Sequence, residues 1–237
     1  PNWLPQFQVF DFPYLFENEA QADAVLDGDL GTEMFALLEE KGIKPLSWME
    51  NGFRNFTNDT RPLVEPADLK GLKIRVMENP LMMDTIKLLG GDPTPIPFNE
   101  LYTALQQGTV DGQENPVNLI YTSKFHEVQK YLTVSGHFYS PYILAMNKAK
   151  FDSFPAEVQT AIKEAAMEAR LYQREVSRKQ VAEYLDKMIE EEGLEVVQLT
   201  DEQKQKWAEA TLPIYDKYKD KIGAELYEKI MAEVKNK

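Results

Sequence analysis

The stretch between Pro155 and Glu192 constrains the fold of this chain more than any other, because it contains no glycine and no internal proline. Alanine, glutamate, lysine, glutamine and arginine dominate it, and these are the strongest helix formers. At a rise of 1.5 Å per residue, a helix over about 155–192 would be about 55 Å long. That length exceeds the diameter of a single small domain, so we expect the helix to span two lobes and to end at Gly193.

Length and charge limit the kind of protein that this chain can be. It has 237 residues, which is long for one domain and sufficient for two. Its formal net charge of −13 disfavours nucleic acid as a partner, because phosphate binding needs clustered lysine and arginine. The same charge repels an anionic ligand, so an anion site must be built locally from buried cationic side chains.

The residues that usually hold metals or form disulfides are scarce. The absence of cysteine excludes disulfides, thiolate chemistry and cysteine zinc sites. The two histidines cannot by themselves build a histidine-rich metal site, and we expect neither a metal nor a cofactor. Apolar runs such as 142–146 fall far short of the roughly 20 residues that cross a bilayer. We therefore expect no direct insertion into a membrane.

Short apolar runs alternate with helical patterns through the first half of the chain, and an opening run at 7–16 predicts a strand followed by a turn. The alternation then predicts strands at 72–77, 94–97 and 110–114 and helices at 81–89 and 99–107. After the long helix, the pattern predicts a strand at 194–199 and helices at 201–219 and 224–235. Strands separated by helices indicate parallel βαβ units and an α/β fold.

Arg75 lies in a turn-to-strand segment, Asp-Leu-Lys-Gly-Leu-Lys-Ile-Arg-Val at 68–76. Strand alternation places Ile74 and Val76 on one face and Arg75 on the other, near the carboxyl end of the strand. Ligands of open α/β sheets gather at that edge, and a guanidinium there can donate two N–H groups to one carboxylate. The alternative is an ordinary surface arginine paired with a nearby acid such as Glu78.

Two further segments could supply groups to the same site. Arg54 lies in Asn-Gly-Phe-Arg-Asn-Phe-Thr-Asn at 51–58 and would be a second cation, or a solvated residue of an edge strand. Asn115 precedes the final proline of Gly-Thr-Val-Asp-Gly-Gln-Glu-Asn-Pro at 108–116, where its amide could bind hydroxyl or carboxylate oxygens or simply cap a turn. Gly112 inside this strand pattern indicates a bulge or a close approach of another backbone.

Together these segments resemble the extracytoplasmic solute receptors of tripartite ATP-independent periplasmic (TRAP) transporters, the DctP-type family. The resemblance also includes Asn-Glu-Leu-Tyr-Thr-Ala-Leu-Gln-Gln, which precedes the third segment, and Phe-Gln-Val-Phe-Asp-Phe-Pro-Tyr-Leu-Phe at 7–16. The very long helix after Phe154 is similar as well. The resemblance covers essentially the whole chain, and the linked motifs are far more specific than any one alone.

The resemblance implies an α/β fold of the periplasmic-binding-protein kind, type II-like, with two lobes around a cleft and a long helix that braces both. We assign 1–52 and 141–180 to lobe I, 53–140 and 181–237 to lobe II, and the long helix to both. Members of the family carry roughly seventy more residues, about two βαβ-sized units, ahead of the segment that opens this chain. We therefore expect the N-terminal part of lobe I to be missing here, together with the signal peptide.

The resemblance also implies which residues form the site. Arg75 matches the family's main carboxylate-binding arginine, and Arg54 matches a second arginine of the cleft. Asn115 matches an amide that contacts the ligand, and Phe98 matches an aromatic residue that packs on it. His137 falls where some members place a polar group behind the site.

The implied function is that of a periplasmic receptor and not of an enzyme. Members of the family bind small organic acids, such as sugar acids, sialic acids and dicarboxylates. They deliver the acid to a TRAP membrane permease, which couples transport to an ion gradient and not to ATP. We expect this chain to act as a monomer.

Two other functions would use features of the same sequence. Carboxylates are plentiful near the predicted strand ends, namely Glu78, Glu100, Asp111 and Glu114. A pair of them could hydrolyse glycosides, although the chain has no G-x-S-x-G, no H-E-x-x-H and no phosphate-binding glycine loop. A receptor that presents its ligand to a sensor protein would use the same cleft as a transport receptor.

Overall fold

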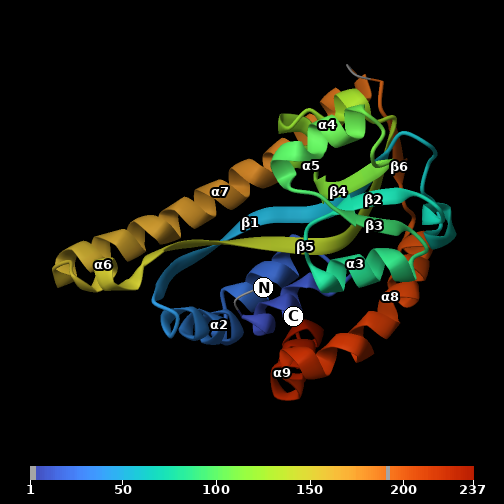
Figure 1. The fold of residues 1–237 in the computed structure, drawn as a ribbon. Helices are drawn as coiled ribbons and strands as arrows, with labels where there is room; N and C mark the ends of the chain where they lie inside the picture. Colours follow the sequence, from blue (N-terminus) through green and yellow to red (C-terminus); the bar gives the residue numbers. More distant parts are fainter. Residues whose placement is uncertain (1–3, 191–192) are drawn as a thin grey trace.

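The structure is a computed structural model that describes residues 4–190 and 193–237 (Figure 1). Its α-helices are α1 Glu19–Leu26, α2 Asp29–Glu39, α3 Pro80–Leu88, α4 Leu101–Gln106, α5 Val117–Thr122, α6 Lys148–Asp152, α7 Ala156–Glu190, α8 Asp201–Ile222 and α9 Ala224–Lys235. Its 3-10 helices are η1 Pro5–Asp11, η2 Pro66–Leu69, η3 Phe98–Glu100 and η4 Phe125–Val128. Its strands are β1 Ile43–Asn58, β2 Lys73–Val76, β3 Asp92–Pro95, β4 Gly112–Pro116, β5 Tyr131–Asn147 and β6 Glu195–Gln198.

Helix α7 confirms the long helix predicted from the sequence. It has 35 residues, which corresponds to a length of about 52 Å. Positions 191–192 of the prediction lie outside the described residues. Gly193 follows with a φ of 67°, the left-handed conformation expected just beyond a helix end. None of the helices in the described part of the chain is both long and apolar enough to cross a bilayer.

The strands form one mixed sheet in the order β3-β2-β4-β1-β5-β6. β2 pairs in parallel with β3 and with β4, so β2–α3–β3 is a parallel βαβ unit, as predicted. β1 runs antiparallel to β4 on one side and to β5 on the other. Helices α4 and α5 lie on one side of this sheet, and α3 and α8 lie on the other (Figure 1). The long strands β1 and β5 continue past the other strands as a two-stranded ribbon beside α7.

The predicted N-terminal strand at 7–16 is wrong, because its first part forms the 3-10 helix η1 with a proline in its first turn. The aromatic side chains explain the difference. The ring centroids of Phe7 and Phe10 lie 6.1 Å and 5.2 Å from that of Trp48. A three-residue spacing puts Phe7 and Phe10 on the same face of a 3-10 helix, whereas strand alternation would put them on opposite faces.

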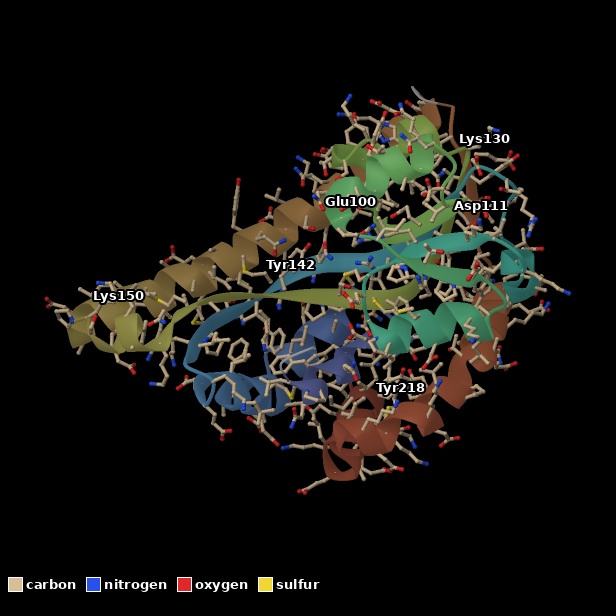
Figure 2. All side chains as sticks on the ribbon, viewed as in Figure 1. Glu100, Asp111, Lys130, Tyr142, Lys150 and Tyr218 are labelled. Atoms are coloured by element: carbon tan, nitrogen blue, oxygen red, sulfur yellow. The ribbon has the colours of Figure 1, made fainter. Side chains whose placement is uncertain are left out.

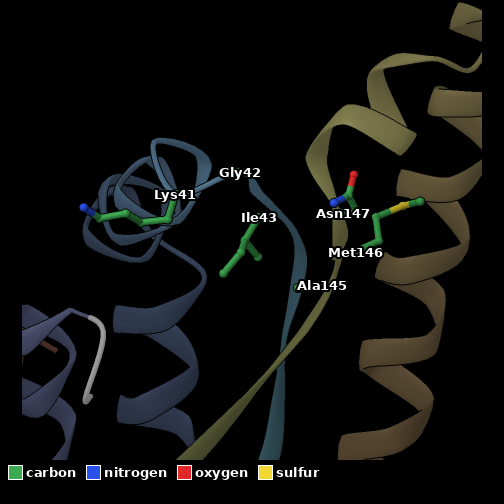
Figure 3. A pocket seen from close by; sticks show the side chains of 6 residues that line it. All are labelled: Lys41, Gly42, Ile43, Ala145, Met146 and Asn147. Carbon is green, nitrogen blue, oxygen red and sulfur yellow. The ribbon is translucent and has the colours of Figure 1, made fainter.

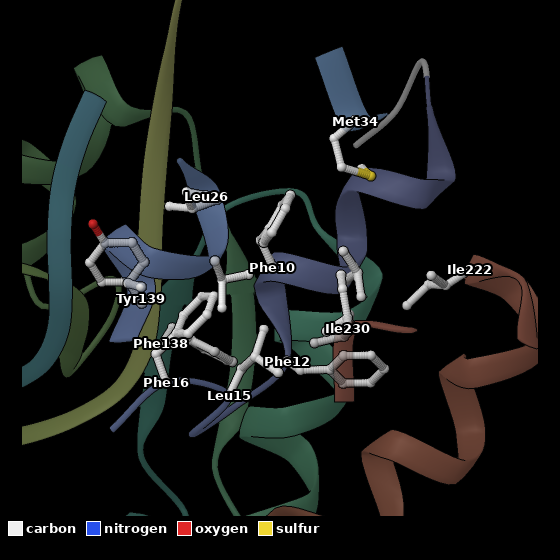
Figure 4. Close-up of a cluster of buried hydrophobic side chains, with 14 of the residues drawn as sticks. Phe10, Phe12, Leu15, Phe16, Leu26, Met34, Phe138, Tyr139, Ile222 and Ile230 are labelled. Atoms are coloured by element: carbon white, nitrogen blue, oxygen red, sulfur yellow. The ribbon is translucent and has the colours of Figure 1, made fainter. Parts of the chain in front are cut away.

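Buried apolar side chains of the described residues gather in three clusters. The largest joins η1, α1 and α2 to the C-terminal helices, and Figure 4 shows Phe12 beside Ile230 within it. The second packs Trp207 of α8 against the strand β2, and the third lies around α4 and α5. The C-terminal helices thus pack on the N-terminal segment. The lobe boundaries that we assigned from the sequence stay a prediction.

Two glycines shape the central strands for different reasons. The register of β1 against β5 shifts between Glu50 and Gly52, and Gly52 has a φ of 110°, which other residues rarely adopt. Gly112 begins β4 where that strand approaches β1. A Cβ atom at Gly112 would lie 2.2 Å from the carbonyl oxygen of Thr57, so the predicted close backbone approach is confirmed.

A second irregularity of β5 places residues 134–137 opposite Asn55 alone, because Arg54 pairs with Phe138 and Phe56 pairs with Thr133. The Asn55 side chain holds this bulge by accepting a hydrogen bond from the backbone N–H of Gly136 at 3.0 Å. Such bulges redirect side chains. Here the bulge contains His137, whose side chain is fully buried.

A network of ion pairs fastens α7 to the N-terminal helices and to β1. Its members are Arg170, Arg174 and Arg178 of α7, Asp23 of α1, Asp27 at the C-cap of α1, and Glu50 of β1. Their four-residue spacing puts the three arginines on one face of the helix. The side-chain amide of Gln173 also donates to the Glu50 carbonyl oxygen at 2.7 Å and accepts from its N–H at 2.9 Å. The helix is therefore hydrogen-bonded directly to the backbone of β1.

We predict that Arg178→Ala destabilises the protein measurably. Arg178 Nη2 lies 2.6 Å from Glu50 Oε2. Without it, the Glu50 carboxylate would keep the Tyr139 hydroxyl, at 3.2 Å, as its remaining hydrogen-bond partner among the described residues. Removing one partner of a fully buried ion pair costs about 3–5 kcal/mol. Since the Arg178 side chain is 34% exposed, we expect a loss of roughly 2 kcal/mol in the free energy of unfolding, measured with urea.

Lys179→Ala is the matched control for this prediction. Lys179 is the next residue on α7, its side chain is 77% exposed, and it pairs only loosely with Glu183 at 3.7 Å. Its substitution should leave the urea midpoint unchanged, because exposed pairs contribute little. Equal midpoints for the two variants would contradict the role of Arg178.

Candidate functional site

Arg75 lies on β2, the central strand of the parallel part of the sheet. Because β2 pairs with β3 on one side and with β4 on the other, its backbone is held along both edges. Ile74 and Val76 are buried in the apolar cluster around Trp207. The Arg75 side chain is also buried, with an exposed fraction of 2%. The strand alternation predicted from the sequence is confirmed.

The protein satisfies the guanidinium of Arg75 only in part. Its Nε donates a hydrogen bond to the carbonyl oxygen of Ile96 at 2.8 Å. Its Nη1 is buried and has no hydrogen-bond partner among the described residues. Glu78 is exposed, and the surface pair that was the alternative for Arg75 is not formed. A buried cation with a free donor edge is suited to bind a carboxylate.

Phe98 lies beside this guanidinium at the start of η3. The centroid of its ring is 5.9 Å from Cζ of Arg75, and the ring packs edge-on against Phe125 with centroids 5.7 Å apart. The exposed fraction of Phe98 is 46%, so part of the ring remains open. An open aromatic surface next to a cation suits the carbon chain of an organic acid.

Arg54 of β1 is paired inside the protein with Glu114 of β4. Its Nε lies 2.5 Å from Glu114 Oε2 and its Nη2 lies 2.8 Å from Oε1, which makes the pair bidentate. Nη2 also donates to the Glu114 carbonyl oxygen at 2.7 Å and to Asn115 Oδ1 at 3.1 Å. The arginine is therefore not the solvated edge residue of our alternative. Its charge is neutralised by an internal carboxylate.

Asn115 uses both ends of its amide within the protein. Oδ1 accepts from Arg54, and Nδ2 donates to Gln113 Oε1 at 2.5 Å. The Gln113 amide donates in turn to the Thr57 hydroxyl at 2.8 Å, and that hydroxyl donates to Gln129 at 2.9 Å. This chain of hydrogen bonds fixes the orientation of Asn115, which does not act as a backbone cap. The sequence identified Gln113 at this strand end but not its link to Thr57.

His137 lies behind the Arg54–Glu114 pair. Its ring stacks on Phe56 with centroids 4.0 Å apart, and its Nδ1 lies 2.7 Å from the Ser135 hydroxyl. Its Nε2 is 3.5 Å from Glu114 Oε2 without the geometry of a hydrogen bond. His137 therefore supports the carboxylate of Glu114 from within the core.

Burial and neighbouring charges set the protonation states of these groups. Burial by itself would raise the pKa of Glu114, but the neighbouring Arg54 guanidinium outweighs it and lowers the pKa to about 2. Burial lowers the pKa of His137 below its usual range, although Glu114 acts in the opposite sense, so His137 is neutral near pH 7. Burial also lowers the pKa of Arg75, which still stays protonated because an arginine starts so high.

Asp11 is a further carboxyl group of this cluster that the sequence did not single out. Its Oδ2 accepts a hydrogen bond from Asn79 Nδ2 at 2.7 Å, while Asn79 Oδ1 caps the N-terminus of α3. Burial raises the pKa of Asp11 to about 6, and the charges of Arg54 and Glu114 also act on it. The signal that could have found Asn79 is its place as a capping residue directly before a proline.

Tyr142 is a second residue near Arg54 that the sequence did not assign to the site. It lies on the ribbon part of β5, where its side chain is 51% exposed (Figure 2). Burial raises the pKa of Tyr142, and the charge of Arg54 acts in the opposite sense. A half-exposed phenol near the arginine pair could contact a ligand that enters from this side.

A concavity at the far end of the ribbon is separate from these residues. It has a volume of about 600 Å³ and is lined by Lys41, Gly42, Ile43, Ala145, Met146 and Asn147 (Figure 3). Ile43 pairs with Asn147 at the end of β1 that is opposite to Arg54. The concavity therefore does not include the unpaired guanidinium.

The sequence model of the bacterial extracellular solute-binding proteins, family 7, matches residues 1–221 of the chain. The 2,3-diketo-L-gulonate-binding periplasmic protein of Escherichia coli is 44% identical over 193 residues, which cover 81% of this chain and 58% of that protein. The C4-dicarboxylate-binding periplasmic protein of Rhodobacter capsulatus is 36% identical, over 95% of this chain and 67% of that protein. The chain thus spans about three fifths to two thirds of the length of these two relatives.

A solved structure supports the same grouping. The sugar acid binding protein of Advenella mimigardefordensis, in complex with galactonate, is 41% identical and superposes with a TM-score of 0.94. The match covers 99% of this chain and 76% of that protein. The predicted α/β fold of the two-lobe periplasmic-binding-protein kind is thereby confirmed.

We predict that acid destabilises the protein through Glu114 and His137. The pKa of Glu114 is about 2 in the folded chain against an ordinary 4.5, so its ionised form stabilises the fold above pH 4.5 and this contribution is lost as the pH falls toward 2. His137 acts in the same direction, because the unfolded chain takes up a proton near 6.5 that the buried ring resists. Asp11 acts in the opposite sense between about pH 6 and pH 4, because its raised pKa favours the folded chain as it takes up a proton. The loss due to Glu114 should therefore appear as a fall in the free energy of unfolding, measured with urea, between about pH 4 and pH 2.

Glu114→Gln provides the comparison for this prediction. The variant is less stable at neutral pH, and its stability should decline less steeply below pH 4.5, the ordinary pKa of the group that has been removed. Parallel pH dependences for the two proteins would show that Glu114 is not the group responsible.

Proposed function

Because the chain belongs to the bacterial extracellular solute-binding proteins of family 7, we propose that it binds a small organic carboxylate between two lobes and delivers it to a TRAP membrane permease. We place it in the periplasm, acting as a monomer. Arg75 is the group that holds the ligand carboxylate, and Phe98 packs against the carbon chain. Arg54 and Asn115 form the polar wall beside Arg75, and His137 supports that wall from behind.

The unsatisfied guanidinium of Arg75 is the observation that carries this proposal. Its Nη1 is buried and unpaired among the described residues, although burying an uncompensated charge is costly. A ligand carboxylate would supply the missing acceptors, and charge-assisted hydrogen bonds contribute about 1.5–3 kcal/mol each. This contribution overcomes the unfavourable field of a chain whose net charge is −13.

Closure of the two lobes follows from the same chemistry. A ligand favours the closed form only if it makes contacts there that the open form lacks. Expelling water strengthens the pair between carboxylate and guanidinium because the local dielectric constant falls. The ribbon of β1 and β5 and the helix α7 continue from the sheet toward the N-terminal helices (Figure 1), so these elements would carry the motion.

The sequence left open whether the ligand is a sugar acid or a dicarboxylate, and the names of relatives include both classes. One relative is named for 2,3-diketo-L-gulonate and another for C4 dicarboxylates, and one solved structure contains galactonate. All of these ligands are organic acids. We extend that shared property, the carboxylate, to this chain.

Hydrolysis by paired carboxylates is the weaker candidate. Glu114 is held ionised by Arg54, so it cannot act as a general acid near neutral pH. Asp111 accepts a hydrogen bond from the backbone N–H of Lys73 at 2.7 Å, at the opposite end of β2 from Val76. Asp11, the other carboxyl group of this cluster within the described residues, is held by Asn79 at 2.7 Å. A receptor for a sensor protein would use the same site, and only its partner would differ.

We predict that Arg75→Ala weakens binding of the acid at least about 100-fold, because a bidentate pair of charge-assisted hydrogen bonds is lost. The affinity of Arg75→Lys for the acid should be about tenfold lower, since an ammonium keeps the charge but lacks the two parallel N–H donors of a guanidinium. Calorimetry on the full chain, with the acid that gives the largest thermal shift in a panel of sugar acids and dicarboxylates, measures both.

Arg170→Ala serves as the control for this measurement. Arg170 is also a partly buried arginine, but it belongs to α7, where it pairs with Asp27 at 2.7 Å. Its substitution should leave the affinity for the acid unchanged. An Arg75→Ala variant that binds as tightly as this control would refute the assigned role.

A further inference from the structure

Arg54 and Arg75 are the buried arginines of this cluster, and Arg75 is the one that lacks an ion pair among the described residues. We infer that the site prefers acids with a single carboxylate, such as aldonates and uronates, over dicarboxylates of the same carbon skeleton. The inference rests on the proposed function and decides between the two ligand classes that the family binds.

The first step is that one of the two buried arginines is already neutralised. Arg54 holds Glu114 through two short contacts, of 2.5 Å and 2.8 Å. Both side chains are almost completely buried, with exposed fractions of 2% and 0%. A ligand carboxylate that approached Arg54 would therefore face Glu114 as well, and the repulsion would cancel much of the attraction.

The second step is that the remaining buried groups add no further positive charge. His137 lies against Glu114 but is neutral, because burial lowers its pKa. Arg75 is the buried cation of this cluster that lacks an ion pair within the described ranges. Glu114 and Arg54 are the charges that act on Arg75, with opposite signs.

The third step is that Asp11 adds negative charge to the same region. Its carboxylate is hydrogen-bonded to Asn79 at 2.7 Å and lies close enough to Arg54 and Glu114 for their charges to act on it. When Asp11 is ionised, the second carboxylate of a diacid meets two internal carboxylates and no free buried cation among the described residues of this cluster. Desolvating a carboxylate without a partner is unfavourable.

The fourth step is that a third buried arginine, Arg174, is occupied elsewhere. Arg174 lies 2.7 Å from Asp27 and 3.0 Å from Asp23, and its neighbour Arg178 is held by Asp23 and Glu50. These side chains fasten α7 to α1 and β1. They cannot turn toward a ligand without breaking that attachment.

The surroundings of Arg75 also suit the uncharged part of a sugar acid. The amides of Asn115 and Gln113 lie on β4, the strand next to Arg75, and are polar but uncharged groups that are hydrogen-bonded to each other. The half-exposed ring of Phe98 covers the other side with an apolar surface. A carboxylate at Arg75 followed by a chain of hydroxylated carbons uses both features without a second negative charge.

The experiment compares matched acids on the full chain by calorimetry. D-Galactonate is paired with galactarate, and D-erythronate is paired with meso-tartrate; within each pair, only the terminal carbon differs, as a hydroxymethyl group or a carboxylate. For each pair that binds, we expect the affinity for the monoacid to exceed the affinity for the diacid by about tenfold or more. A diacid that binds as tightly as its monoacid would overturn the inference and leave the proposed function intact. Failure of all four acids to bind would overturn both.

Two variants test the cause of the preference. Glu114→Gln and Asp11→Asn each remove one negative charge from the cluster while keeping the shape of the side chain. Each should shift the ratio of affinities toward the diacid by about tenfold. Asp11→Asn keeps an oxygen that can accept from Asn79, so it tests the idea even if Glu114→Gln does not fold.

Glu157→Gln is the matched control for net charge. Glu157 is exposed in the first turn of α7, near the far end of the ribbon. Its substitution changes the net charge by the same amount but should leave the ratio of affinities unchanged. A shift as large in this control as in Asp11→Asn would show that overall charge, and not the cluster, sets the preference, which would overturn the inference.

Discussion

The ion pair between Arg54 and Glu114 is the interaction on which the rest of the site depends. It joins the antiparallel strands β1 and β4 through side chains that are almost completely buried. Asn115 and His137 lie on either side of the pair. Asn115 accepts a hydrogen bond from Arg54, and the His137 ring lies against the Glu114 carboxylate. Because the pair is internally neutral, the neighbouring Arg75 becomes the place where an external anion can act.

Much of the fold could be predicted because its signals are local. The absence of glycine and proline after Pro155 was enough to predict α7, and the alternation at 72–77 was enough to predict β2 and the face on which Arg75 lies. The segment at 7–16 failed because aromatic spacing is ambiguous over one short stretch. Only the contact with Trp48, far along the chain, shows that a 3-10 helix buries these rings better than a strand.

The residues of the candidate site could be proposed from the sequence, but the contacts between them could not. The sequence and the family resemblance together indicated Arg75, Arg54 and Asn115, yet nothing local reveals that Glu114 lies 2.5 Å from one of the arginines and leaves the other unpaired. That distinction depends on the register of β1 against β4, which is set by contacts between residues about sixty positions apart. Asp11 could not be predicted as part of the site for the same reason, since its hydrogen-bond partner Asn79 belongs to a different element.

The hydrogen bonds between Gln173 and the backbone of Glu50 have a consequence for how motion could be observed. The amide proton of Glu50 donates to a side chain of α7. Its exchange with solvent deuterium requires this hydrogen bond between helix and strand to open. The exchange rate of this single proton therefore measures how often the brace detaches from the ribbon, separately from global unfolding.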